Sequence, residues 1–237
     1  MCAQSAAPLN TPVFQAHAHG QSIWLDNISR DLLLSGELRR WVAAEGIRGV
    51  TSNPAIFEKA IAKSNDYDAA ARALVAQGAK DALDVFERLA VVDIQLGCDV
   101  LRPVYESSEG RDGFVSLEVS PHLAHDTAGT IAEAHRLAHA VSRDNLMIKV
   151  PATPAGIPAI RQLIEDGLNV NVTLLFAVSA YQAVHDAYMA GLEARLAKGL
   201  PISGIASVAS FFVSRIDASV SQKAEKLIAA GAAPDVK

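Results

Sequence analysis

Short apolar runs alternate with longer segments of helical period along the chain, and this alternation is its main structural signal. The apolar runs have the length of buried strands, and no two of them are joined by a tight two-residue hairpin. Six successive strand-then-helix units predict a parallel sheet covered by helices. The predicted strands are 22–26, 46–53, 113–119, 146–151, 170–176 and 202–210.

Start and stop signals delimit the helices between these strands. Asn53 followed by Pro54 predicts a helix start, because asparagine caps helices and proline suits the first helical position. Gly167, Gly199 and Gly231 predict helix ends. The segment between the second and third strands is too long for one crossover helix, so two are expected there. The predicted helices are 56–77, 80–107, 126–141, 157–166, 179–196 and 213–230.

A parallel α/β sheet is either open and doubly wound or closed into a (β/α)₈ TIM barrel. The turn after the first strand, 24–29, contains no glycine, whereas a dinucleotide-binding open sheet carries G-x-G-x-x-G there. We therefore predict a barrel of which about six strand-helix units are present. Residues 1–20 are expected to be a flexible leader, and residues 21–237 one barrel domain that is incomplete at its C-terminus.

Polar residues interrupt the predicted strands at every second position, toward the end of each run. Glu118, Lys149, Thr173 and Asp26 follow this rule on four different strands. Since strand side chains alternate with period two, all four can point into one barrel interior while their apolar neighbours meet the helices. The pattern predicts a single polar site at the C-terminal ends of the strands.

Lys149 is the residue around which this site is interpreted. A lysine at the end of a strand can reach solvent with its ammonium group, and the strand alone leaves that alternative about equally open. Burial, in contrast, favours a neutral and nucleophilic amine. Two carboxylates, Asp26 and Glu118, and the hydroxyl of Thr173 would supply acid and base partners, a set that suits Schiff-base chemistry on a carbonyl.

Composition excludes several other classes of function. The 237 residues carry 21 Lys and Arg against 26 Asp and Glu, a net charge of −5, and only 5% are aromatic. A protein that binds nucleic acid usually has a basic surface or aromatic residues that stack on bases, so no nucleic-acid partner is expected. No apolar run is long enough for a membrane span, and no membrane partner is expected. Cys2 and Cys98 give no disulfide pattern and fit a reducing cytoplasm. No cofactor is expected, and no metal, because His135 and His139 lie among apolar residues of a predicted outer helix.

Six motifs, taken in order, resemble the transaldolase family. They are Trp24-Leu25-Asp26, Val50-Thr51-Ser52-Asn53-Pro54, Ser116-Leu117-Glu118-Val119, Ile148-Lys149-Val150-Pro151-Ala152-Thr153, Asn171-Val172-Thr173-Leu174-Leu175-Phe176 and Ser210-Phe211-Phe212-Val213-Ser214-Arg215. The resemblance extends from about Gln21 to Ala230. It implies a barrel that moves a dihydroxyacetone unit from sedoheptulose 7-phosphate or fructose 6-phosphate to an aldose phosphate, in the pentose phosphate pathway.

The resemblance also implies residue roles. Lys149 would form the imine, Asp26 would take the proton of the hydroxyl beside the bond that breaks, and Glu118 and Thr173 would hold a catalytic water. The substrate would be bound by Asn53, Asn171, Ser210, Phe212 and Arg215, with Ser210 and Arg215 on the phosphate. The residues themselves allow plainer alternatives: Asn53 and Ser210 as helix caps, and Arg215 as a solvated arginine on a helix surface.

The sequence departs from the family because the chain ends after its sixth strand-helix unit, whereas the family barrel has eight. We expect a piece of a longer polypeptide, unstable on its own. One alternative function is fructose 6-phosphate aldolase, which by resemblance has glutamine at the position of Glu118 and tyrosine at that of Phe212. A metal-dependent aldolase or a non-enzymatic sugar-phosphate-binding barrel is less expected. The oligomeric state stays open, with a homo-oligomer among the alternatives.

Overall fold

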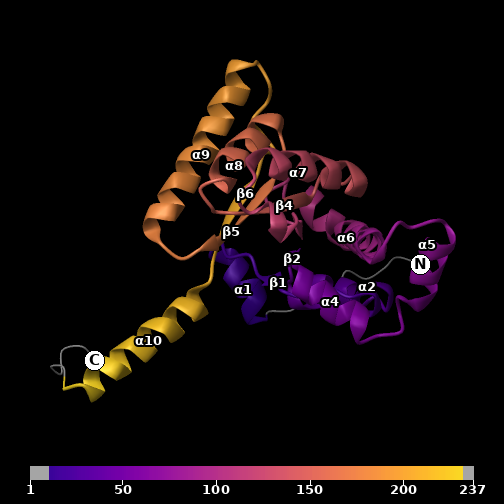
Figure 1. Ribbon diagram of the computed structural model, residues 1–237, viewed down its shortest axis with the longest axis horizontal. Coiled ribbons are helices and arrows are strands. Elements are labelled where there is room, and N and C mark those ends of the chain that lie inside the picture. Colours follow the sequence, from indigo (N-terminus) through magenta and orange to yellow (C-terminus); the bar gives the residue numbers. More distant parts are fainter. Residues whose placement is uncertain (1–10, 232–237) are drawn as a thin grey trace.

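Six parallel strands form one sheet in the order in which they occur along the chain, a half-barrel (Figure 1). The structure is a computed structural model and describes residues 11–231. An open doubly wound sheet reverses its strand order, and this sheet does not, which confirms the barrel-type prediction. The strands are β1 (Trp24–Leu25), β2 (Gly49–Thr51), β3 (Val115–Glu118), β4 (Leu146–Pro151), β5 (Val170–Leu175) and β6 (Ser207–Phe211).

Helices connect every strand to the next. They are α1 (Pro12–Ala18), α2 (Arg30–Leu34), α3 (Glu37–Arg40), the π-helical turn η1 (Trp41–Glu45), α4 (Pro54–Ala62), α5 (Asp68–Ala76), α6 (Ala82–Ser107), the 3₁₀ turn η2 (Pro121–Leu123), α7 (Thr127–Val141), α8 (Gly156–Asp166), α9 (Val178–Ala197) and α10 (Val213–Ala229). Consecutive helices from α6 to α9 contact one another in sequence order. Helix α10 extends away from the sheet and buries no residue (Figure 1).

The apolar runs coincide with the observed strands, although most strands are shorter than predicted. Strand β4 has the predicted bounds 146–151, whereas the sixth run forms a strand only from Ser207. Its first residues turn instead: Gly204 has a φ of +84°, a left-handed conformation that favours glycine, and the amide of Ile205 donates to the carbonyl of Ile202. Hydrophobicity alone therefore marked this strand too early.

The single helix predicted over 56–77 is wrong, because two helices, α4 and α5, occupy this segment. The chain leaves α4 at Lys63 and turns at Ser64, whose hydroxyl contacts the carboxylate of Asp66 and accepts a hydrogen bond from its amide at 3.0 Å. Serine and aspartate compete with the helix for backbone hydrogen bonds in this way. The predicted helix 80–107 corresponds to α6.

Part of the expected leader is helical. Helix α1 begins after Thr11, whose hydroxyl accepts from the amide of Phe14 at 3.3 Å, and Arg48 Nε donates to Nδ1 of His17 at 3.3 Å. This contact ties α1 to the segment that precedes β2. Residues 1–10 of the expected leader, and Cys2 with them, lie outside the described residues.

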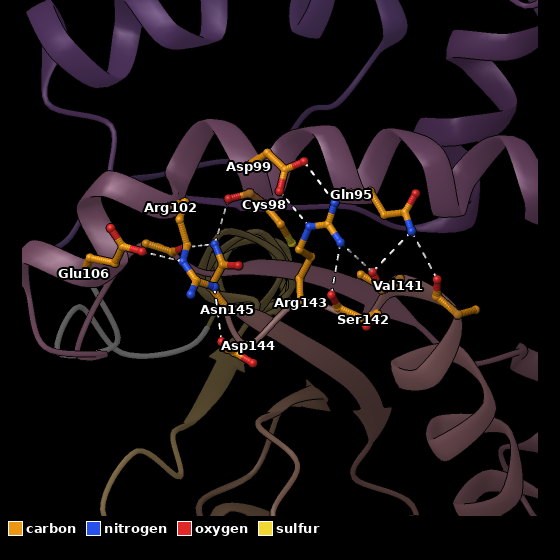
Figure 2. A network of polar contacts seen from close by, with 12 residues as sticks. Gln95, Cys98, Asp99, Arg102, Glu106, Val141, Ser142, Arg143, Asp144 and Asn145 are labelled. Atoms are coloured by element: carbon orange, nitrogen blue, oxygen red, sulfur yellow. Dashed lines mark hydrogen bonds and ion pairs between the residues drawn. The ribbon is translucent and has the colours of Figure 1, made fainter.

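The amino-terminal ends of the strands are fastened to α6 by polar contacts (Figure 2). Asn145, just before β4, donates from Nδ2 to the carbonyls of Cys98 at 2.9 Å and Gly113 at 2.8 Å. Arg143 pairs with Asp99 at 2.6 Å, from Nε to Oδ1. In barrels of this architecture such contacts at the bottom serve stability, while the carboxyl ends of the strands carry chemistry. The candidate site lies at those carboxyl ends.

Candidate active site

Lys149 lies near the carboxyl end of β4 with 9% of its side chain exposed. Its Nζ donates to the backbone carbonyl of Ser52, which follows β2, at 2.6 Å. Register places Glu118 of β3 and Asn171 of β5 directly beside it on the two neighbouring strands. The lysine is therefore a buried amine between two polar side chains, rather than one that reaches into solvent.

Glu118 is the carboxylate nearest to this amine. Its Oε2 lies 3.7 Å from Lys149 Nζ, and 24% of the side chain is exposed. Burial raises the pKa of Glu118 above its ordinary value, and the attraction and hydrogen bonding of Lys149 oppose that rise without cancelling it. A carboxyl group in this state can release and accept protons at a higher pH than an exposed glutamate.

A chain of hydrogen bonds crosses the inner face of the sheet beside the lysine. Asn171 donates from Nδ2 to Oγ of Ser116 at 3.0 Å, and its Oδ1 accepts from Oγ of Ser210 at 2.7 Å. Because β4 lies between β3 and β5, contact between Asn171 and Ser116 requires the sheet to be concave on this face. The predicted inward parity of Lys149, Glu118 and Asn171 is consistent with these contacts.

Thr173 is buried near the end of β5, and its Oγ1 has no hydrogen-bond partner among the described residues. The next residue, Leu174, has a φ of +60°, at an irregularity in the pairing of β5 with β6. A buried hydroxyl without a protein partner is suited to bind water or a polar group of a ligand. Leu174 gives the strand a bulge that period-two reasoning does not anticipate.

No hydrogen bond or ion pair joins Asp26 to Lys149 among residues 11–231. Asp26 follows β1, which is separated from β4 by β2 and β3, and its side chain is exposed without a hydrogen bond or ion pair among residues 11–231. Asn53 caps α4, where its Oδ1 accepts from the amide of Ile56 at 2.9 Å. Asn53 and Glu118 nevertheless line one cavity of about 390 Å³ between α4, α6 and α7.

Arg215, Phe212 and Phe176 form a second group, at the carboxyl ends of β5 and β6. The ring centroids of Phe176 and Phe212 lie 5.5 Å apart with nearly parallel planes, and the Arg215 guanidinium lies 4.7 Å from the centroid of Phe212. Arg215 is exposed in the first turn of α10 and has no ion pair among the described residues. An unpaired guanidinium at a helix start suits an anion.

Two site features escape sequence reasoning. The carbonyl of Ser52 holds the lysine, but a backbone acceptor leaves no signal in side-chain pattern. Ser116 had inward parity in its strand, yet a serine carries no charge that would single it out. Within residues 11–231, no three His, Cys, Asp or Glu side chains are grouped to hold a metal, and no helix has the length and hydropathy to span a membrane.

Comparison with known proteins agrees with this geometry. The family model described as Transaldolase/Fructose-6-phosphate aldolase matches residues 23–236. Transaldolase 2 of Nostoc sp. is 54% identical over 213 residues, covering 90% of this chain and 56% of the relative. The Thiobacillus denitrificans transaldolase is 50% identical over 202 residues, covering 85% and 56%. The chain thus spans about half the length of the curated relatives it matches. It belongs to the transaldolase and fructose-6-phosphate aldolase family.

Proposed function

We propose that this chain carries the Schiff-base half of a transaldolase site, which transfers a dihydroxyacetone unit from a ketose phosphate to an aldose phosphate. The observation that carries the proposal is the buried amine of Lys149, 3.7 Å from the Glu118 carboxylate, with Asn171 beside it in register. The family of the chain supports the substrate class. The cysteine usage described above favours the cytoplasm as its compartment.

In the proposed reaction, the neutral amine of Lys149 adds to the donor carbonyl, and loss of water gives an imine. Asp26 then takes the proton of the hydroxyl on the carbon beside the breaking carbon–carbon bond. That bond breaks, an aldose phosphate leaves, and the electron pair stays on the bound three-carbon unit as an enamine. The enamine attacks the acceptor aldehyde, and hydrolysis of the new imine releases the product.

Proton movements around the imine are assigned to Glu118 and Thr173. The raised pKa of Glu118 suits a carboxyl group that exchanges protons at a higher pH than an exposed glutamate does. The Thr173 hydroxyl, which has no hydrogen-bond partner within residues 11–231, suits a water held between Thr173 and Glu118. The sugar is proposed to contact Asn53, Asn171, Ser210 and Phe212. The phosphate is assigned to Arg215, because its guanidinium has no ion pair within the described residues.

Reductive trapping tests the proposal. The chain is incubated with fructose 6-phosphate and borohydride, and the modified peptide is mapped by mass spectrometry. We expect a reduced three-carbon adduct on Lys149 and none in Lys149→Met, whereas Lys63→Met, which alters an exposed lysine, keeps the adduct. An adduct on Lys59, Lys63 or Lys80 would contradict the assignment.

The same incubation separates transfer from simple cleavage. With an aldose phosphate acceptor, a transferase yields the new ketose phosphate, and without acceptor it stays loaded with the three-carbon unit. A fructose 6-phosphate aldolase releases free dihydroxyacetone without an acceptor. Release of dihydroxyacetone at the rate of donor consumption would favour the aldolase over the transaldolase.

A further inference from the structure

The loop between β1 and α2, residues 26–29, carries the exposed Asp26 but is fixed on both of its sides. Before it, Leu25 pairs with Val50 of β2. Within it, Ile28 is fully buried, and its Cδ1 would lie 3.5 Å from a Cβ added to Gly97 of α6. Ile28 thus packs against the Gly97 position of α6.

Arg30, directly after the loop, makes a second contact with α6. Its Nε lies 2.6 Å from Oδ1 of Asp93, whose side chain is fully buried, and 11% of the Arg30 side chain is exposed. Asp93 and Gly97 are four residues apart, so they share one face of α6. That face therefore holds the loop at Ile28 and at Arg30.

Tyr67, the residue before α5, completes the arrangement. Its hydroxyl donates to Oδ2 of Asp93 at 2.7 Å and accepts from the backbone amide of Arg30 at 2.8 Å. The Arg30 guanidinium also lies 4.8 Å from the centroid of the Tyr67 ring. Burial raises the pKa of Tyr67, so the hydroxyl keeps the proton that it donates. A single hydroxyl thus connects the buried carboxylate to the first backbone amide of α2.

A buried ion pair is a weak source of stability, because desolvation offsets most of the attraction, and apolar residues of similar size often serve as well. What the ion pair between Arg30 and Asp93 provides here is a defined position of the loop 26–29. Each of these hydrogen bonds joins a defined donor to a defined acceptor, whereas apolar packing tolerates small shifts of the loop. Among residues 11–231, the ionisable side chain that this loop presents to solvent is Asp26.

We propose that Arg30, Asp93 and Tyr67 are positioning residues that hold the Asp26 loop in the geometry needed for proton transfer. The proposal rests on the proposed function, in which Asp26 takes the hydroxyl proton. Misplacement of a catalytic group by about 1 Å can cost about 100-fold in rate. Loss of this contact is therefore expected to slow bond cleavage while imine formation at Lys149, three strands away, continues.

The test replaces Tyr67 by phenylalanine, which keeps the ring and removes the hydroxyl alone. The matched control is Tyr105→Phe, since Tyr105 lies at the other end of α6 against Phe114. We expect Tyr67→Phe to lower kcat about 10- to 100-fold with KM nearly unchanged, and borohydride trapping on Lys149 to persist. Tyr105→Phe should leave kcat unchanged.

A double variant separates positioning from general destabilisation. In an Asp26→Asn background there is no carboxylate to position, so adding Tyr67→Phe should lower kcat no further. If kcat of the double variant instead falls by the product of the two single-variant losses, the positioning role is overturned. If Asp26→Asn and Lys149→Met both retain the rate of the parent chain, the proposed function fails instead, and the two failures are distinguishable.

Hydrogen exchange gives a readout that does not depend on turnover. The amides of residues 26–30 should exchange at least about 10-fold faster in Tyr67→Phe than in the parent chain, because the Arg30 amide loses its acceptor. Amides of β4 should be unchanged. Equal exchange of 26–30 in Tyr67→Phe, Tyr105→Phe and the parent chain would overturn the inference.

Discussion

Replacement of Glu118 by glutamine tests the proposed acid–base role of the Glu118 carboxylate. Glutamine has nearly the same shape, so packing at the end of β3 is preserved, but it has no negative charge and no basic oxygen. The change acts 3.7 Å from Lys149 Nζ, measured to Oε2. Arg215 lies after β6, three strands from Glu118, so phosphate binding should be little affected.

The expected loss of rate follows from the role of the carboxylate. General acid–base help is worth about 10²–10⁴-fold, and each tenfold step corresponds to about 1.4 kcal/mol of activation free energy. Glu118→Gln should therefore raise the barrier to transfer by about 3–5 kcal/mol. The KM for the ketose phosphate should stay close to that of the parent chain.

The folding stability of Glu118→Gln should not fall as its transfer rate does. At 3.7 Å and an effective dielectric constant of about 20, attraction to Lys149 is worth about 4 kcal/mol before desolvation. The pKa of Glu118 is nevertheless raised, so burial of the charge outweighs this attraction. Stability from such a group is complete below its ordinary pKa and is lost as pH rises through the raised value. Glu118→Gln should lack this loss and be at least as stable at pH 7.

Three measurements check the prediction: transfer rates, borohydride trapping on Lys149, and urea unfolding over a pH series that begins below the ordinary pKa of glutamate. Glu106→Gln, an exposed change at the far end of α6, is the control. The reasoning is refuted if Glu118→Gln transfers within about twofold of the parent rate. Loss of substrate binding in Glu118→Gln would show instead that Glu118 holds the ligand.

Further predictions concern residues that shape the site. Asn171→Ala should lower the free energy of unfolding by about 1–3 kcal/mol in urea melts, because it leaves the buried Ser116 hydroxyl without this donor; no change would show that the bond is not maintained in solution. Leu174→Val should be less stable than Leu174→Gly by about 1–2 kcal/mol, since φ is +60° there, and equal stability would argue against the bulge. Gly191→Ala should cost about 1–3 kcal/mol by thermal melting, because its Cβ would lie 2.6 Å from the Arg161 carbonyl; a neutral effect would mean that α8 and α9 can separate.

Alternation of apolar and polar residues was enough to locate the six strands, though not their ends, and the parity that it predicted for Lys149 and Asn171 is consistent with their contacts. The cause is that strand side chains alternate between the two faces: in a barrel the outer face of each strand meets helices, so the polar residues of a site collect on the inner face. Asn53 also caps its helix as the Asn-Pro pair predicted. Local rules of this kind depend on neighbours in sequence and need no knowledge of tertiary contacts.

Features that depend on contacts between distant segments could not be predicted. The acceptor for Lys149 is a backbone carbonyl 97 residues away, and side-chain chemistry does not encode it. One local feature was also missed: the hydroxyl of Ser64 accepts from the Asp66 amide and interrupts a helix that composition alone favours. The placement of Asp26 depends on how far the sheet curves, which period-two patterning leaves undetermined, so its distance from the lysine was beyond the sequence.

The sequential strand order has a consequence for how the chain acquires its structure during synthesis. Each strand pairs with the one made just before it, so every new strand-helix unit can dock on a surface that already exists. Domains form from their N-terminal part as the ribosome releases about 5–20 residues per second. A sheet built in this order can grow unit by unit. At every stage its newest strand presents an unpaired edge, as β6 does among residues 11–231. During synthesis, the newest edge is therefore the surface on which the next strand-helix unit docks.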